Sequence, residues 1–441
     1  MRLKLINEHW SDITGDNERG CTMSELAIRV GDINLTENYN SWSKTVDETV
    51  VVSAFPLSMW LLENWWRLLC EPLPGYLGGR LNVDWRMAHE MGAANEGFVW
   101  PAIAFVSDYE NIHIFARPSG DKKQSVRYIN GLNHPEAVSV ASFEGGVERF
   151  VTEVVNRLKS LKMRGGAIEE LWKIIAQERS DPETALYRRI EASMGYDPDE
   201  AEEALMRYAI EKQAETGSGS LSELAPLYGK YSNDSLLGIE KLIDSSSVAG
   251  KPEISLPRRD HGASRKSTPW KEAFRDAQLL RKEISKDREP LDTDILFNLL
   301  GISSNDKNRW ERIGEKRRVS VGIPERDGGS FKFIPRKRHP LGRRFELARY
   351  LGDFFYTTDK QWLVGSDLGT VRQKYQRAFA AELLCPAEGL LEYLGYDFSR
   401  ENLEDAAEHF RVSEFVVEST LMNSGYMKDT GSMEVPYSFH D

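Results

Sequence analysis

Apolar residues recur along much of this chain at the spacing of an α-helix. In VERFVTEVVNRLKSL, residues 147–161, they fall three and four positions apart and form one continuous face. The same spacing predicts further helices at 58–70, 270–284, 371–384, 402–410 and 413–424. Most of the helical pattern therefore lies after residue 145.

The first part of the chain mixes this helical spacing with β-rich runs. LAIRVGDINL and ETVVVSAFPL are rich in β-branched residues, and GFVWPAIAFVSD and ENIHIFARPS flank a polar turn. The last two segments predict a β-hairpin. Together these patterns indicate an α+β fold class for the N-terminal region.

Composition along the chain predicts four segments. Glycine and serine cluster at 217–220 and again near 245–250, and several prolines follow, as is typical of linkers. We therefore expect an N-terminal α+β domain of unknown role at 1–145, a helical connector at 146–214, a linker at 215–269, and a C-terminal domain with a terminal helical subdomain at 270–441.

Overall composition narrows the class of protein. The chain has 441 residues and a formal net charge of −12, which argues against nonspecific nucleic-acid binding by the whole protein. Its three cysteines are far apart in sequence, the N-terminus has no apolar signal region, and no apolar run is long enough for a membrane span. We expect a cytoplasmic protein with no membrane partner.

Four segments of the C-terminal domain carry a recognisable pattern. They are PLDTDILFNLLGIS, then RRFELARYLGDFF at 343–355, then RAFAAELLCP at 377–386, and finally AAEHFRVSEFVVESTLMNSGY at 406–426. In order and spacing, residues 270–426 resemble the ImmA/IrrE family of zinc metallopeptidases. The resemblance implies a shortened zincin-like fold, with a His-Glu-x-x-His helix, a glutamate ligand on a second helix, and active members that cleave helix-turn-helix repressors.

The zinc chemistry of that family does not transfer to this sequence. The resemblance places Arg349 at the first ligand, Tyr350 at the general base, Asp353 at the second ligand and Gln373 at the third. A guanidinium has no lone pair to offer a metal, and a phenol is a poor base at neutral pH. Because a catalytic zinc needs about three protein ligands, we expect a degenerate motif with no catalytic residue, metal or cofactor.

The substituted positions allow two interpretations. Arg349 and Asp353 lie four residues apart on one helix face, where opposite charges can pair. The pair is either a solvated surface ion pair or a structural plug that fills the former active site.

The histidines offer no obvious replacement zinc site. None of the eight forms an HxH or HxxxH pair. His89 precedes Glu90 in RMAHEMGAAN, but the second histidine position there is Ala93. We interpret His89 as a packing residue, with a binding role in the N-terminal domain as the alternative.

A basic stretch precedes the motif helix. Residues 307–344 contain thirteen Lys and Arg against four Asp and Glu, an excess of nine. Such residues either protect strand edges or form a docking surface for DNA, RNA or an acidic protein segment. The partner-binding candidates are Arg336, Lys337, Arg338, Arg343 and Arg344.

These patterns favour a catalytically inactive pseudopeptidase that acts as a regulatory or partner-binding protein. The context implied by the family resemblance is bacterial stress, a mobile element or phage defence, and the partner would be a helix-turn-helix regulator or another subunit. Two alternatives remain open: an active peptidase with zinc in a rearranged site, and a nucleic-acid-associated component that uses residues 307–344.

Overall fold

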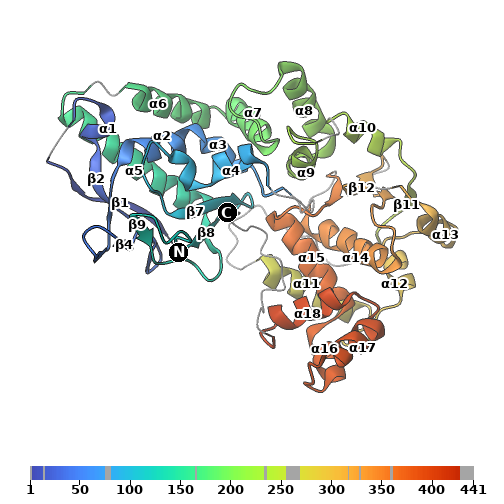
Figure 1. Cartoon of the computed structure of the whole chain (residues 1–441). Helices are drawn as coiled ribbons and strands as arrows, with labels where there is room; N and C mark the ends of the chain where they lie inside the picture. Colours follow the sequence, from blue (N-terminus) through green and yellow to red (C-terminus); the bar gives the residue numbers. More distant parts are fainter. Residues whose placement is uncertain are drawn as a thin grey trace. The chain divides into compact units, whose positions relative to one another are not determined.

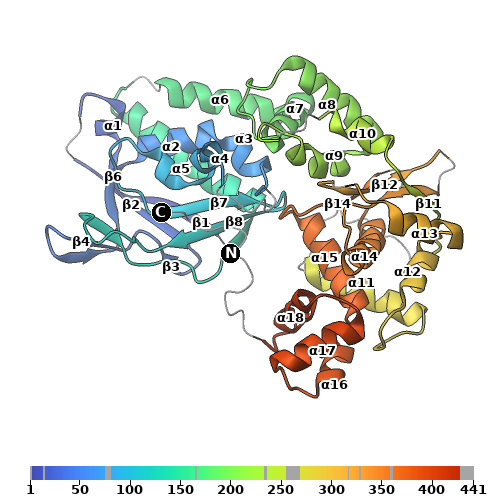
Figure 2. The same cartoon turned by 45° about the vertical axis from the view of Figure 1, so that its right-hand side comes forward.

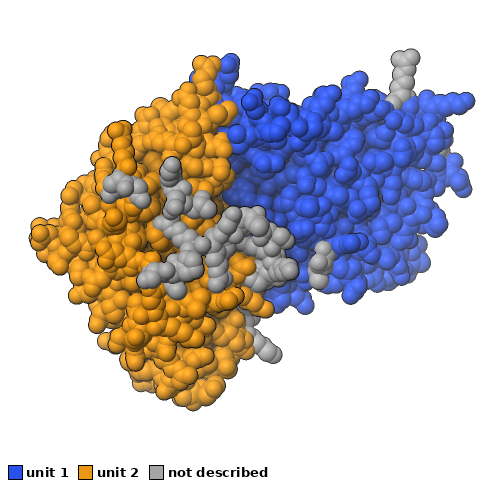
Figure 3. All heavy atoms as spheres, turned by 180° about the vertical axis from the view of Figure 1, so that it is seen from behind, with its two compact units in different colours: residues 1–206, 229–231, 437–441 blue, residues 207–228, 232–436 orange. Residues whose placement is uncertain are grey.

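The structure is a computed structural model of the chain (Figure 1), and it describes residues 2–12, 15–74, 81–163, 166–232, 236–254, 269–315, 317–326, 329–357 and 361–427. Helices combine with small antiparallel sheets (Figure 2), which confirms the mixed helix-and-strand class predicted from the sequence. The described residues form two compact units (Figure 3). Unit 1 extends to Met206 and includes 229–231, and unit 2 comprises 207–228 and the described chain from Ser232 onward.

Unit 1 contains three small sheets. The first pairs β1 (Leu3–Trp10), β2 (Met23–Val30), β3 (Ile33–Asn34) and β6 (Val50–Ser53); the second has the order β10 (Glu136–Ser139), β8 (Asn111–Arg117), β7 (Ala102–Ser107); the third has the order β5 (Thr45–Asp47), β4 (Asn38–Asn40), β9 (Val126–Tyr128). Strands β7 and β8 form the predicted hairpin, with Ser107 opposite Ile112. The hairpin prediction is confirmed.

The helices of unit 1 supply most of its apolar core. They are α1 (Glu18–Cys21), α2 (Ala54–Glu63), α3 (Trp65–Cys70), α4 (Val83–His89), η1 (Met91–Ala94), α5 (Val140–Ser160), α6 (Gly166–Ser180) and α7 (Pro182–Ser193). The helix predicted at 58–70 is two helices, since the first begins at Ala54 and Asn64 separates it from the second. Residues 48–57, predicted as a β-rich run, therefore divide between β6 and the start of α2.

The helical segment 146–214 is not a separate connector. Helix α5 buries Val147, Phe150, Val151 and Val154 in the core of unit 1, and α6 and α7 belong to the same unit. The boundary falls inside α8 (Glu203–Thr216), whose later residues belong to unit 2. An amphipathic helix needs an apolar surface to cover, and α5 covers the strands and helices that precede it in sequence.

Unit 2 has one sheet, in the order β11 (Val248–Gly250), β13 (Phe331–Ile334), β12 (Ser320–Pro324), β14 (Leu363–Gly365). Its helices after α8 are α9 (Ser218–Leu224), η2 (Ala225–Leu227), α10 (Gly238–Ile243), α11 (Pro269–Glu283), α12 (Thr293–Leu299), α13 (Ser304–Arg312), α14 (Pro340–Tyr356), α15 (Val371–Leu384), α16 (Ala387–Leu394), α17 (Arg400–Phe410) and α18 (Glu414–Asn423). The helices predicted at 270–284, 371–384, 402–410 and 413–424 are confirmed to within two residues.

The segment 215–269, expected as a linker, contributes structure to unit 2. It contains α9, η2, α10 and β11, and β11 pairs with β13 through Val248 opposite Phe333. Ser220 is fully buried, and a Cβ at Gly250 would lie 2.5 Å from the carbonyl oxygen of Leu300. These small residues allow close packing, so their composition does not mark a flexible chain. Residues 255–268 lie outside the described part.

Helices α14 and α15 lie against each other in the centre of unit 2. Gly352 marks their close approach, because a Cβ there would lie 2.9 Å from Cδ1 of Phe379. Leu347 and Leu351 of α14 are fully buried in the same core. Among the described residues, no helix combines the length and apolar character that a membrane span requires.

Candidate functional site

The motif positions all lie inside unit 2. Arg349, Tyr350 and Asp353 project from α14, Gln373 projects from α15, and each is at most 4% exposed. The solvated surface ion pair considered from the sequence is therefore wrong, because these side chains are buried.

Asp353 pairs with an arginine that the sequence did not suggest. Its two carboxylate oxygens accept hydrogen bonds from Nε and Nη2 of Arg372, each at 2.7 Å, and Oδ2 also accepts from the backbone N–H of Val364 at 2.7 Å. Burial alone would lower the pKa of Arg372, but the carboxylate of Asp353 outweighs it and raises that pKa. The predicted pair of Arg349 with Asp353 is replaced by a bidentate ion pair between α14 and α15.

Arg349 binds carbonyl oxygens instead of a carboxylate. Its Nη2 donates to Ser366 O at 2.9 Å, to Gln376 Oε1 at 3.1 Å, and to the side-chain oxygen of Gln373. Burial, together with the nearby guanidinium groups of Arg336 and Arg377, lowers the pKa of Arg349 to about 9. A cation is thus held among neutral dipoles and other cations.

Gln373 connects these groups to α9. Its amide nitrogen donates to Val364 O at 2.8 Å and to Glu223 Oε2 at 2.9 Å, and its amide oxygen accepts from Ser366 N at 2.8 Å. Glu223 also accepts from the hydroxyl of Thr370 at 2.7 Å, and burial raises its pKa. Residues far apart in sequence therefore meet in one buried network, which we call the α14–α15 network: Glu223, Arg349, Asp353, Thr370, Arg372, Gln373 and Gln376.

Tyr350 faces the sheet and takes no part in this network. Its hydroxyl donates to Ile334 O at 2.8 Å, and its ring lies 5.0 Å from that of Phe333. Burial raises its pKa well above the ordinary value for tyrosine. Proton abstraction at this position is therefore even less favourable than for an exposed phenol.

The described chain offers no alternative metal cluster. In its described ranges, His, Cys, Asp and Glu do not come together in any group of three that could hold a metal ion. His89 in unit 1 contacts Phe105 O at 2.9 Å and Glu71 Oε2 at 3.0 Å, and its ring stacks on Trp85. With no exposed surface, His89 fits its interpretation as a packing residue.

Three of the five basic docking candidates are structural. Arg336 forms two hydrogen bonds with Asp367, at 2.7 and 2.6 Å. Arg343 donates to backbone carbonyls at Trp310 and Ile313, and Arg344 donates to Leu291 O and to Thr293 Oγ1. Long cationic side chains here hold loops and α14 together, and all three residues are at most 7% exposed, so they do not form an exposed docking surface. Lys337 and Arg338 are exposed.

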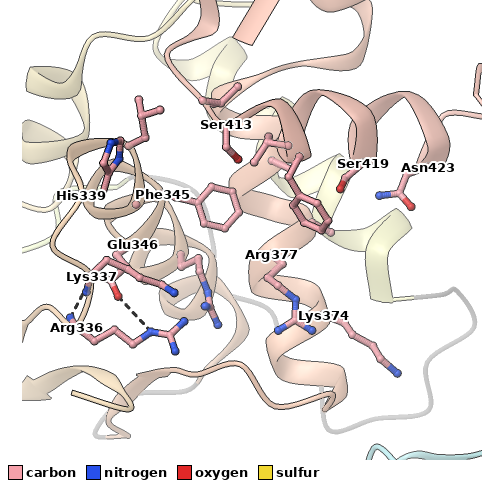
Figure 4. A pocket seen from close by; sticks show the side chains of 18 of the residues that line it. Arg336, Lys337, His339, Phe345, Glu346, Lys374, Arg377, Ser413, Ser419 and Asn423 are labelled. Carbon is pink, nitrogen blue, oxygen red and sulfur yellow. Dashed lines mark hydrogen bonds and ion pairs between the residues drawn. The ribbon is translucent and has the colours of Figure 1, made fainter. Parts of the chain in front are cut away.

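A cavity of about 670 Å³ lies beside the network, within unit 2. It is bounded by α14, α15, α18 and the segment before α14, with Trp270 from α11. Its charged lining is mostly basic: Arg336, Lys337, Arg349, Lys374 and Arg377 against Glu346. Figure 4 shows Arg336, Lys337 and Glu346 together, Arg377 near Lys374, and the Phe345 ring pointing toward the helix that carries Ser419.

The sequence carried an unused signal for part of this arrangement. VRQKYQRAF places polar side chains at 372, 373, 376 and 377, at spacings of three and four along the helix. On α14, Glu346, Arg349 and Asp353 repeat at spacings of three and four, which places them on one face. Two polar stripes on helices that are both buried indicate a polar contact between them.

Comparison with known proteins returns no match. No family model matches the chain, and neither a curated protein nor a solved structure shows significant similarity to it.

Proposed function

We propose that this chain is a catalytically inactive, partner-binding protein. In this proposal unit 2 has the shortened zincin-like fold of the ImmA/IrrE metallopeptidases without its zinc site. The protein would act in the bacterial cytoplasm in a stress, mobile-element or phage-defence context, by binding a helix-turn-helix regulator or another subunit.

The observation that carries this proposal is the complete pairing of Asp353 within the α14–α15 network. A catalytic zinc needs about three protein ligands and an open position for water or substrate. Asp353 is the one carboxylate at a ligand position, and Arg372 and the Val364 N–H already bind it. Freeing it would leave Arg372 buried without its carboxylate, which costs about 3–5 kcal/mol.

The replacements also support retention of the fold for a purpose other than catalysis. Arg349, Gln373 and Gln376 replace a metal-centred connection with hydrogen bonds between the same two helices. Buried hydrogen bonds between a cation and neutral oxygens keep these two helices in one arrangement. Such order would serve no purpose if the region had no function.

The test is a metal measurement on the full-length protein. Purified protein is incubated with zinc sulfate, separated from free metal by gel filtration and analysed by mass spectrometry for zinc, and its cleavage of a helix-turn-helix repressor is assayed with and without a chelator. We expect substoichiometric zinc and no cleavage. Stoichiometric zinc that disappears in Asp353→Ala, together with chelator-sensitive cleavage, would replace this proposal with the active peptidase.

A further inference from the structure

The cavity beside the α14–α15 network has the size of a small-molecule site. Its volume of about 670 Å³ falls within the range of roughly 300–1,000 Å³ that is usual for ligand pockets. All its lining residues belong to unit 2 and to the described part of the chain. The site is therefore formed within a single unit.

Its polar lining carries unbalanced positive charge. Of the five cations, Arg336 is paired with Asp367 and also contacts Glu346 at 3.4 Å. Burial raises the pKa of Glu346, which weakens it as a counter-ion. Arg349 and Arg377 direct their hydrogen bonds to neutral oxygens, Arg377 to Leu368 O at 3.1 Å.

Four buried polar atoms in the lining have no hydrogen-bond partner among the described residues, and two of them, Nε of Arg336 and Oε1 of Glu346, face each other as an ion pair at 3.4 Å. The other two have no such contact. One is Nε of Arg349, a residue only 4% exposed, and the other is Oγ of Ser419. Buried donors are nearly always hydrogen-bonded in folded proteins, and leaving one unpaired costs about 1–3 kcal/mol. Among the lining guanidinium groups, that of Arg377 is half-buried and therefore reachable from the cavity, where it is suited to an anionic oxygen.

The remaining lining is apolar. Phe345, Ala378 and Val416 are among its side chains, and the aromatic residues Trp270 and Phe415 are 43% and 61% exposed. An anion without an apolar body would leave these surfaces in water. An apolar molecule without a charge would leave the guanidinium groups of Arg349 and Arg377 bonded to neutral oxygens alone.

We infer that this pocket binds a small amphipathic anion, in which a carboxylate or phosphate head group is joined to an aromatic or alkyl body. The head group accepts hydrogen bonds from Arg349 and Arg377, and the body packs against Phe345 and Val416. Because Arg349 also belongs to the α14–α15 network, ligand binding would stabilise unit 2. The inference is independent of the proposed function, since it requires neither loss nor retention of a metal site.

The experiment is isothermal titration calorimetry on the full-length protein with four probes: naphthalene carboxylate, naphthyl phosphate, neutral naphthol and inorganic phosphate. We expect at least one naphthyl anion to bind at least tenfold more tightly than naphthol or inorganic phosphate, since a charge-assisted hydrogen bond contributes a factor of about ten or more. The tighter of the two naphthyl anions identifies the head group.

Three variants locate the site, with circular dichroism to verify folding. Arg377→Met should weaken binding of the naphthyl anions about tenfold, and Ala378→Phe should abolish it by filling the cavity. The matched control Lys282→Ala removes an exposed positive charge outside the pocket lining and should leave affinity unchanged. If Arg377→Met folds poorly, Ala378→Phe still tests the site.

Several results would overturn the inference. These are equal affinity for naphthol and the naphthyl anions, equal affinity for inorganic phosphate and naphthyl phosphate, no binding at millimolar probe, or binding that folded Ala378→Phe retains in full. None of them bears on the zinc measurement, so failure of the pocket and failure of the proposed function can be told apart.

Discussion

Helices α14 and α15 share two polar regions that differ in how completely their groups are paired. In the α14–α15 network, Asp353 accepts three hydrogen bonds, and both ends of the Gln373 amide are bonded. In the neighbouring pocket, Arg349 Nε and Ser419 Oγ are buried with no partner in the described chain. The two regions meet at Arg349, which contributes to both.

The difference separates a structural role from a binding role. The paired groups of the network fix one arrangement of the helices, and Asp353, which is bonded on both oxygens, has no remaining capacity for a metal. An unsaturated pocket leaves donors for a ligand, at a cost in the stability of the free protein. Position in the predicted motif is therefore a weaker guide to function than the pairing of each group.

The largest effect is expected from Asp353→Ala. The substitution leaves Arg372 buried without its carboxylate, so the free energy of unfolding should fall by about 3–5 kcal/mol. Urea denaturation of the full-length protein measures it. The matched control is Asp294→Ala, which breaks an ion pair with Lys307 in which Asp294 is 72% exposed, and there we expect a loss below about 1 kcal/mol.

A double variant tests the reason for that loss. With Asp353→Leu and Arg372→Leu combined, neither charge is left unpaired, so much of the stability should return. Equal losses in Asp353→Ala and Asp294→Ala would contradict the account of the network as structurally essential.

Glu223→Gln should change how stability depends on pH. Burial raises the pKa of Glu223 in the folded state, so its stabilising contribution is full below the ordinary glutamate pKa and is lost as the pH rises through the folded value. At pH values between the ordinary glutamate pKa and the raised folded-state pKa of Glu223, the unfolding free energy of the wild type should fall relative to that of the variant. The fall should be about 1.4 kcal/mol per pH unit. Parallel denaturation series from acid to neutral pH measure it, and a difference that is constant with pH would exclude this role.

Arg349→Met should distinguish the contribution of the α14–α15 network from that of the pocket. The network loses the hydrogen bonds of Nη2, but a buried cation whose pKa is lowered to about 9 is also removed. We expect a net stability loss of only about 1 kcal/mol, with loss of naphthyl-anion binding in calorimetry. A large stability loss with binding intact would mean that Arg349 serves the network alone.

The helices of the fold were predictable because their signal is local. The apolar spacing at 371–384 gave the bounds of α15, and that at 147–161 located α5. In the described part of the segment 215–269, the linker prediction was wrong for a non-local reason. Ser220 and Gly250 are small because Trp362 O and Leu300 O approach them from distant parts of the chain.

The site was predictable in position but not in pairing. Arg349 and Asp353 do lie on the same helix, but their partners Arg372 and Gln376 come from α15, and Glu223 comes from α9. Helical spacing identifies neighbours on one helix only. Which other helix supplies a partner depends on packing: Arg372 lies 19 residues from Asp353 in sequence, and Glu223 lies 150 residues from Gln373.

The smallest effect is expected from the exposed basic residues before α14. Lys337→Ala with Arg338→Ala should change stability by no more than about 0.5 kcal/mol, as is usual for surface substitutions. Because Arg336 is already paired with Asp367, Lys337 and Arg338 carry the exposed charge of residues 336–338. We expect fluorescence anisotropy to show no salt-sensitive DNA or RNA binding by the wild type. Salt-sensitive binding that weakens in the double variant would instead show that Lys337 and Arg338 contact nucleic acid. The α14–α15 network would then have only a structural role.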